Sequence, residues 1–347
     1  MTAQFRTWLP LGLMVWGLTW IPQSLAASDG ANPPGSDARA ALTDFQRPQK
    51  TPASKSNPTT PEKVALGQML FFDPRMSGSG AISCATCHNP ALGWSDAMPT
   101  GLGHMGGRLK RHTPTILNVA YGEPYFWDGR AATLEEQAKG PLTSAAEMNM
   151  PAAVAVSRIQ SIPGYVTAFS YAFPGQSISI DTIAAALASY ERTVVSASAP
   201  FDKWVAGDES AISQAAKRGF ELFNGKANCA VCHAGWRMTD DGFHDIGIAG
   251  TDLGRAGVSP GIVQMEHAFK TPTLRNVSQR APYMHDGSLP TLAAVIDHYD
   301  SGFVTRPSLD TQMRRLGLTS EEKADLLAFL GSLTSSDPPT IVPVLPQ

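Results

Sequence analysis

The stretch Cys84-Ala85-Thr86-Cys87-His88 decides the fold, and it recurs as Cys229-Ala230-Val231-Cys232-His233. Together the two copies use all four cysteines of the chain. Cys-x-x-Cys-His is the covalent attachment signature of c-type haem. Two thiols on one turn add to the vinyl groups of a porphyrin, and the adjacent histidine supplies the proximal nitrogen to its iron. The predicted attachment residues are Cys84 and Cys87 with iron ligand His88, and Cys229 and Cys232 with iron ligand His233.

A structural zinc site, a redox-active dithiol and a disulfide are the alternatives for this pattern. A structural zinc site needs four ligands, whereas each cluster offers three and has no obvious fourth nearby. A redox dithiol does not need a histidine directly after its second cysteine. Two covalently bound haem c groups are therefore the prediction.

The first 26 residues have the pattern of a secretory signal peptide, with Arg6 before an apolar core and Ser24-Leu25-Ala26 at the cleavage position. The apolar run is too short for a comfortable membrane span, and an uncleaved anchor is the alternative. We expect a periplasmic protein with no membrane span after signal removal. The net charge of −3 and the lack of a basic patch argue against a nucleic-acid partner.

The sequence contains an internal repeat beyond the haem motifs. Residues 113–119 recur as 271–277, and residues 124–129 recur as 282–287, both at an offset of 158 residues. A helical apolar pattern precedes each motif, and its small residue, Gly67 or Gly219, is suited to crossing another helix. We predict an all-α fold of two tandem cytochrome c-type domains with long haem-wrapping loops. The predicted segments are a signal peptide (1–26), a flexible lead-in or packed strap (27–61), domain 1 (62–200), domain 2 (201–335) and a tail (336–347).

The repeat allows the two irons to be compared. At the same offset Tyr299 corresponds to Pro141. A tyrosine can bind iron through its phenolate, whereas proline offers no ligand atom. We therefore predict a six-coordinate His/Tyr haem in the second half and an open iron, able to bind peroxide or oxygen, in the first. The alternatives are that Tyr299 is a core aromatic and that His298 is the ligand.

Three further residues are expected near the irons. Gln137 and Glu147 flank Pro141, and a carboxylate beside an open iron can move a proton between the two oxygens of peroxide. Trp127 stands where the second half has His285, and an indole between two haems can relay electron holes. The alternatives are a solvated helix-end charge for Glu147 and core packing for Trp127. The predicted catalytic residues are Gln137, Glu147, Trp127 and Pro141.

These residues together resemble the bacterial dihaem cytochrome c peroxidase family, and within it the MauG-like, methylamine-utilisation branch. The resemblance covers about residues 61–333 and is carried by the haem motifs and by residues 126–131, 139–142 and 272–276. It implies that peroxide reacts at the first haem beside Gln137 and Glu147. It also implies that the second haem has a tyrosine ligand, Tyr299, where ordinary peroxidases have methionine. A phenolate favours more oxidised iron than a thioether does.

The chain departs from the family pattern at two places. His104 matches the histidine that closes the peroxide-reactive haem of many resting peroxidases, but we favour an open site because Tyr299 indicates the MauG-like branch. The family also binds calcium between the haems through an asparagine side chain and two carbonyl groups. His112 takes the asparagine position, although imidazole is a poor calcium ligand, and Arg280 and Pro282 supply the carbonyl positions.

The resemblance implies an enzyme that uses H2O2, or O2 plus electrons, to oxidise tryptophan residues of a protein substrate. The reaction expected is completion of the tryptophan tryptophylquinone cofactor of immature methylamine dehydrogenase. One alternative is a peroxidase that takes electrons from a small c-type cytochrome or cupredoxin. The other is a non-enzymatic dihaem electron carrier.

Overall fold

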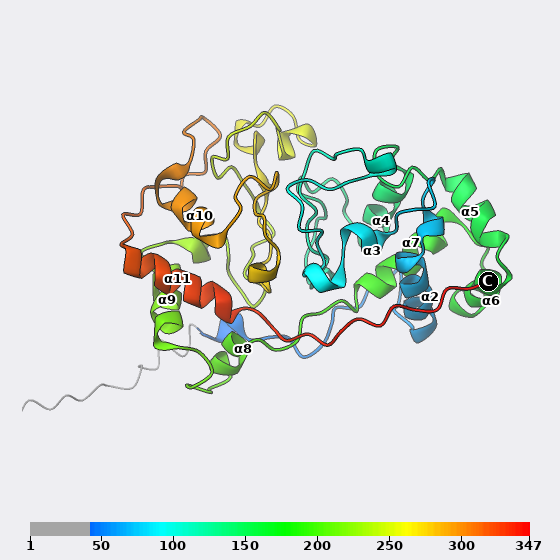
Figure 1. Cartoon of the computed structure of the whole chain (residues 1–347), viewed down its shortest axis with the longest axis horizontal. Coiled ribbons are helices and arrows are strands. Elements are labelled where there is room, and N and C mark those ends of the chain that lie inside the picture. Colours follow the sequence, from blue (N-terminus) through cyan, green and yellow to red (C-terminus); the bar gives the residue numbers. More distant parts are fainter. Residues whose placement is uncertain (1–41) are drawn as a thin grey trace, which may run out of the picture.

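The computed structural model describes residues 42–347 as two lobes lying side by side (Figure 1). The predicted signal peptide and the first part of the lead-in fall outside the described residues. The described chain is mostly helical, and its one sheet pairs β1 (Phe243–His244) with β2 (Phe269–Lys270) antiparallel. The predicted all-α fold is confirmed. None of the helices in residues 42–347 has the length and apolar character needed to cross a lipid bilayer.

Each lobe contains one haem motif and its own helices. The first lobe has α2 (Pro61–Phe72), α3 (Cys84–Cys87), α4 (Leu134–Thr143), α5 (Ala152–Gln160), α6 (Pro163–Ala172) and α7 (Ile180–Glu191). The second lobe has α8 (Pro200–Val205), α9 (Gln214–Asn224), α10 (Leu292–Asp297), the π-helical turn η10 (His298–Gly302) and α11 (Ser320–Ser332). Short 3-10 turns lie in the connections: η1 (Thr43–Phe45), η2 (Pro74–Met76), η3 (Pro90–Leu92), η4 (His104–Gly106), η5 (Val119–Tyr121), η6 (Cys229–Val231), η7 (Arg255–Gly257), η8 (Val263–Met265) and η9 (Val277–Gln279).

In both lobes the helix before the haem motif crosses the last helix at a glycine. A Cβ atom at Gly67 of α2 would lie 2.0 Å from the carbonyl oxygen of Ala186 in α7. A Cβ atom at Gly219 of α9 would likewise lie 2.0 Å from the carbonyl oxygen of Asp325 in α11. Any side chain there would hold the helices apart, so the prediction of a small residue at each crossing is confirmed.

Aromatic side chains pack one turn beyond each glycine. Phe71 lies 5.2 Å from Tyr190 between ring centroids, and Phe223 lies 4.9 Å from Phe329. The contacts of the two crossings match: Ala186 corresponds to Asp325, and Tyr190 corresponds to Phe329. Helices α7 and α11 therefore correspond at a constant offset of 139 residues. The duplication is therefore structural as well as sequential.

The repeated loops also fold alike. Isolated backbone bridges join Tyr125 to Ala131 in the first half and Tyr283 to Leu289 in the second, 158 residues further on. Asn118 and its counterpart Asn276 both have left-handed backbones, with φ values of 63° and 56°. Each half thus presents the same hairpin toward the boundary between the lobes.

Three stretches of chain run between the lobes (Figure 1): residues 42–60, the connection after α7, and the C-terminal tail. Phe45 packs at 5.3 Å from Phe220 in the second lobe. Asn57 donates to the side-chain oxygen of Glu135 at 2.7 Å and to the carbonyl of Ala185 at 2.8 Å in the first. Phe45 and Asn57 therefore anchor the described part of the lead-in on both lobes. This part is a packed strap, the alternative to the flexible segment that was expected.

The C-terminal tail is extended and lies along the first lobe. The side chain of Gln68 donates to the carbonyl of Ile341 at 3.0 Å, and that of Arg75 donates to the carbonyl of Pro346 at 2.9 Å. The connection after α7 contains the short helix α8. Phe201 of α8 is fully buried in the core of the second lobe and anchors the connection there. The strap, the connection after α7 and the tail therefore link the two lobes in addition to the contacts between them.

Candidate active site

A single cavity of about 1380 Å³ extends through both lobes. All four cysteines and both motif histidines line it. Its walls come from the haem motifs, from the repeated hairpins, and from the last helix of each lobe, α7 and α11. The cavity is therefore continuous from one predicted haem site to the other.

The two motif histidines are oriented in the same way. The Nδ1 atom of His88 donates to the carbonyl of Trp94 at 3.3 Å, and that of His233 donates to the carbonyl of Met238 at 2.9 Å. This fixes the tautomer, so each Nε2 keeps its lone pair for a metal. Burial lowers the pKa of both imidazoles, which keeps them neutral. Both residues therefore fit the role of proximal iron ligand.

The cysteine thiols are suited to covalent attachment and poorly suited to thiolate chemistry. Burial raises the pKa of Cys87 to about 11 and that of Cys229 to about 12, and it raises the pKa of Cys84 further. A zinc ligand or redox thiol needs the opposite shift. Apolar walls around paired thiols and a histidine fit a porphyrin.

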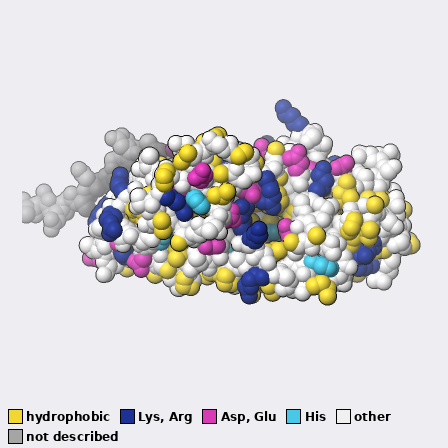
Figure 2. Space-filling model, turned by 90° about the horizontal axis from the view of Figure 1, so that it is seen from above, with side chains coloured by type: hydrophobic (Ala, Val, Ile, Leu, Met, Phe, Trp, Pro, Cys, Tyr) yellow, Lys and Arg dark blue, Asp and Glu magenta, His cyan; other side chains and the backbone are white. Residues whose placement is uncertain are grey.

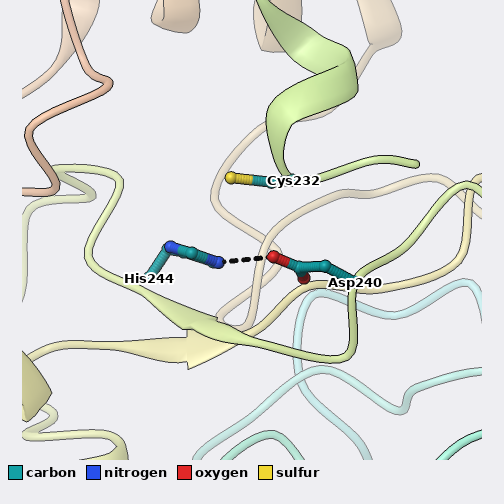
Figure 3. A group of neighbouring side chains, drawn as sticks. All are labelled: Cys232, Asp240 and His244. Carbon is teal, nitrogen blue, oxygen red and sulfur yellow. Dashed lines mark hydrogen bonds and ion pairs between the residues drawn. The ribbon is translucent and has the colours of Figure 1, made fainter.

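Among residues 42–347, one cluster has the composition of a metal site: Cys232, Asp240 and His244 (Figure 3). His244 hydrogen-bonds Asp240 through Nε2 at 2.9 Å and Asp310 through Nδ1 at 2.6 Å. Hydrogen bonds with Asp240 first, then with Cys232 and Asp310, raise the pKa of His244 to about 11. Cys232 belongs to the second haem motif, and both imidazole nitrogens of His244 are engaged by carboxylates.

The predicted distal residues of the first site meet in the cavity. Gln137 and Pro141 project from α4, and Glu147 follows on the next turn; all three line the cavity. Burial raises the pKa of Glu147, and the nearby Arg130 and a hydrogen bond with Ser144 partly oppose the shift. A carboxyl group with a raised pKa is suited to general acid–base catalysis.

His104 lies beside this region but is not among the cavity-lining residues. Its backbone amide donates to the carbonyl of Ala146 at 3.0 Å. A Cβ atom at the preceding Gly103 would lie 1.9 Å from the same carbonyl oxygen. The loop is thus docked against the segment that leads to Glu147.

At the second site the two candidate ligands, His298 and Tyr299, have different surroundings. His298 donates through Nε2 to the carbonyl of Ile246 at 2.8 Å and does not line the cavity. Tyr299 lines it, and burial first, then the neighbouring Cys229 and Cys232, raises the pKa of its phenol. Within residues 42–347 its hydroxyl has no hydrogen-bond partner, so it is available to a group bound in the cavity.

Trp127 connects the two lobes. Its indole nitrogen donates to the carbonyl of His112 at 2.8 Å, and its own carbonyl accepts from the amide of Lys270 at 2.8 Å. The amide of His112 in turn donates to the carbonyl of His285 at 2.7 Å. The His285 ring stacks on Phe269 with a centroid distance of 3.5 Å. Trp127 and its counterpart His285 both line the cavity between the haem motifs.

The side chain expected to bind calcium is already engaged. His112 donates through Nδ1 to the carbonyl of Met98 at 2.7 Å, and its Nε2 lies 3.4 Å from the hydroxyl of Ser95. The Arg280 guanidinium donates to the carbonyls of Thr273 and Arg275 at 2.7 and 2.9 Å. Any calcium ion here would therefore depend on the backbone carbonyls of Arg280 and Pro282.

An ion-pair network that we did not predict joins the lobes beside the cavity. Arg111 donates to both oxygens of Asp252, at 2.7 and 2.9 Å, and to Asp128 at 2.7 Å. Charged side chains gather near the middle of the molecule in the view from above (Figure 2). Arg255 adds bonds to the carbonyls of Asp128 and Gly129. Asp252 lies outside the repeated segments, so the internal repeat could not reveal this network.

Two porphyrin sites of this kind define a c-type protein with two covalently bound haems. The family described as Di-haem cytochrome c peroxidase matches residues 61–210, and the family described as Cytochrome c matches residues 216–334. The chain belongs to the di-haem cytochrome c peroxidase family and is a haem-dependent oxidoreductase.

The chain is similar to the methylamine utilization protein MauG of Methylorubrum extorquens, at 50% identity over 92% of each chain. It is 35% identical to the cytochrome c551 peroxidase of Nitrosomonas europaea, over 85% of this chain and 86% of the relative. A solved MauG-like protein associated with microbial copper homeostasis superimposes with a TM-score of 0.76 at 31% identity, covering 84% of this chain and 95% of that chain. These relatives support both the dihaem prediction and the recognised family.

Proposed function

We propose that this protein is a periplasmic dihaem enzyme that uses H2O2, or O2 plus electrons, to oxidise tryptophan residues of a protein substrate. The substrate we propose is immature methylamine dehydrogenase, and the product is its tryptophan tryptophylquinone cofactor. The observation that carries the proposal is the pair Tyr299 and Pro141. Equivalent positions face the two haem sites, with a phenol at one and no ligand at the other.

In this proposal each side chain has a separate task. His88 and His233 hold the two irons, and the haems supply the oxidising chemistry when bound. Gln137 positions peroxide at the first site, and Glu147 moves its proton from one oxygen to the other. Trp127 carries oxidising equivalents to the His233/Tyr299 site, from which they leave toward the protein substrate.

The cytochrome c peroxidase alternative has one specific observation in its favour. His104 lies on a loop next to Glu147, as a closing ligand of a peroxide site would. Such an enzyme would take electrons from a small c-type cytochrome or cupredoxin. The carrier alternative requires two six-coordinate irons, and because Pro141 has no ligand atom, His104 would have to bind the first.

The test compares the two reactions in one holoprotein preparation. Peroxide is added with immature methylamine dehydrogenase or with reduced cytochrome c, and quinone absorbance and cytochrome oxidation are followed. We expect quinone formation to dominate and Tyr299→Met to abolish it. Tyr171→Met, which changes an exposed tyrosine, is the matched control. Cytochrome oxidation that outpaces quinone formation in the unmodified enzyme would establish the peroxidase instead.

We further propose that calcium, if bound, is held through the carbonyls of Arg280 and Pro282 with water completing its shell. Two neutral protein ligands make a weak site. Metal analysis of the purified holoprotein before and after chelation tests this, and retention of stoichiometric calcium through prolonged chelation would contradict it.

A further inference from the structure

The last helices of the two lobes differ at one cavity-lining position. Because α7 and α11 correspond at an offset of 139 residues, Leu187 matches Leu326 and Glu191 matches Leu330. All four side chains line the cavity. The duplicated domain therefore has a carboxyl group at its first haem site where an aliphatic side chain faces the second.

Glu191 is buried without a partner for one of its oxygens. Its exposed fraction is 6%, and within the described residues its Oε2 atom has no hydrogen-bond partner. The adjacent Arg192 donates instead to both carboxylate oxygens of Glu135, at 2.8 and 3.0 Å. A buried carboxylate with a purely structural role would be expected to form an ion pair with that arginine.

The surroundings of Glu191 favour its neutral form. Burial raises the pKa of Glu191 to about 8, Arg192 opposes the shift, and Glu135 on α4 adds to it. Burial first, with an electrostatic contribution from Glu191, raises the pKa of Tyr125 in the loop and of Cys84 in α3. Lys63 on α2 interacts with Arg192 and Glu135. Glu191 therefore holds a proton at neutral pH beside the site of Cys84.

We propose that Glu191 is a redox-linked proton-binding site of the first haem. On one-electron oxidation of the haem that this site would hold, by an electrode mediator, the Glu191 carboxyl would lose one proton to solvent. Reduction reverses both transfers. Charge at the site is thereby conserved, with the carboxylate balancing the positive charge gained by the ferric iron.

The physical argument follows from the low dielectric of the cavity. An unbalanced positive charge is costly in apolar surroundings, and a neighbouring carboxyl group ionises more readily when that charge appears. The matching position at the second site, Leu330, has no proton to release. The proposal goes beyond the proposed function and holds whichever electron donor or protein substrate the enzyme uses.

The experiment is a spectroelectrochemical titration of the holoprotein across neutral and alkaline pH. The midpoint potential of the first haem should fall as pH rises, toward the one-electron limit of about 59 mV for each tenfold change in proton concentration. In Glu191→Gln the potential of the first haem should lose this dependence. The pH profile of the second haem should be the same in both proteins, which makes it the internal control.

Two further variants keep the result decisive. Glu191→Leu copies Leu330 and replaces Glu191→Gln if that variant fails to bind haem. Glu136→Gln, which changes an exposed carboxyl group on α4, is the control and should keep the slope. Redox difference infrared spectra should show a protonated-carboxyl band in the reduced enzyme that is absent from Glu191→Gln.

A potential that does not change with pH in the unmodified enzyme would overturn the proposal. So would a slope that survives in Glu191→Gln or disappears in Glu136→Gln. None of these outcomes bears on quinone formation, so the proposed function is judged separately.

Discussion

His298 and Tyr299 are neighbours in the chain whose rings lie 5.5 Å apart at an angle of 78°, yet they have opposite surroundings. The histidine is bonded to the Ile246 carbonyl, whereas the tyrosine lines the cavity. Both lie in the π-helical turn η10, where helical geometry is altered, and such turns are frequent at functional sites. Tyr299 rather than His298 is therefore the candidate ligand at the second haem site.

The first prediction concerns this pair. Tyr299→Phe should convert the second haem from a six-coordinate to a five-coordinate high-spin state, because the phenyl ring has no ligand atom. His298→Gln should leave the ligand set unchanged. Electron paramagnetic resonance of the resting ferric proteins measures both. A second-haem signal altered only by the histidine substitution would reverse the assignment.

The second prediction concerns the helix crossing of the second lobe. Gly219→Ala should destabilise the holoprotein by about 1–3 kcal/mol, because the added methyl group would overlap a backbone carbonyl that cannot move independently. Gly331→Ala in α11 is the control, since a Cβ atom there meets nothing within 4 Å. It should be neutral or stabilise by about 0.4–1 kcal/mol. Denaturant unfolding gives both values, and equal effects would contradict the packing argument.

A third prediction follows from the ion pairs between the lobes. Hydrogen bonds from Arg111, the largest cause, lower the pKa of Asp252 to about 2 from its usual 3.8. A lowered folded-state pKa contributes stability that is complete above the unfolded pKa and is lost as pH falls through the folded value. Asp252→Asn should therefore cost on the order of 1–2 kcal/mol at neutral pH.

That difference should narrow as pH falls from about 4 toward 2, where the unmodified carboxylate also becomes protonated. The measurement is the free energy of unfolding of both proteins as a function of pH. Asp181→Asn, which removes an exposed ion pair with Lys139, serves as the control and should show little effect. A constant gap across this range would mean that Asp252 acts by packing.

The fourth prediction concerns Glu147. Glu147→Gln should slow the reaction with H2O2 by about 10²–10⁴-fold while leaving the haem spectra intact, because the amide cannot accept the peroxide proton. In the unmodified enzyme the rate should rise with pH through the raised pKa of Glu147, since the base is its ionised form. Stopped-flow mixing gives the rates. Glu136→Gln, which changes an exposed carboxyl group on α4, is the control. Loss of the pH dependence in this control would contradict the assignment of the base to Glu147.

Much of this molecule could be predicted from its sequence because the duplication supplies an internal comparison. The two haem motifs fixed the number of sites, and the offset of 158 residues paired Tyr299 with Pro141. Both residues line the cavity. Such pairings need no coordinates, because equivalent positions in a repeated fold face equivalent surroundings.

The remaining features depend on contacts that composition does not encode. The offset changes to 139 residues in the last helices, so the pairing of Glu191 with Leu330 became visible only from the helix crossings. His112 was predicted from its position, but its bond to the Met98 carbonyl is set by the fold of a loop. The lead-in has little apolar content, and the packing of Phe45 depends on a core that lies far along the chain.

Phe45, which precedes every helix of the first lobe, completes the aromatic core of the second. A fragment that begins after α7 would consequently lack one ring of its own interior. The second domain has therefore lost the autonomy of an ancestral unit: expressed without the start of the chain, it would have a hole in its core.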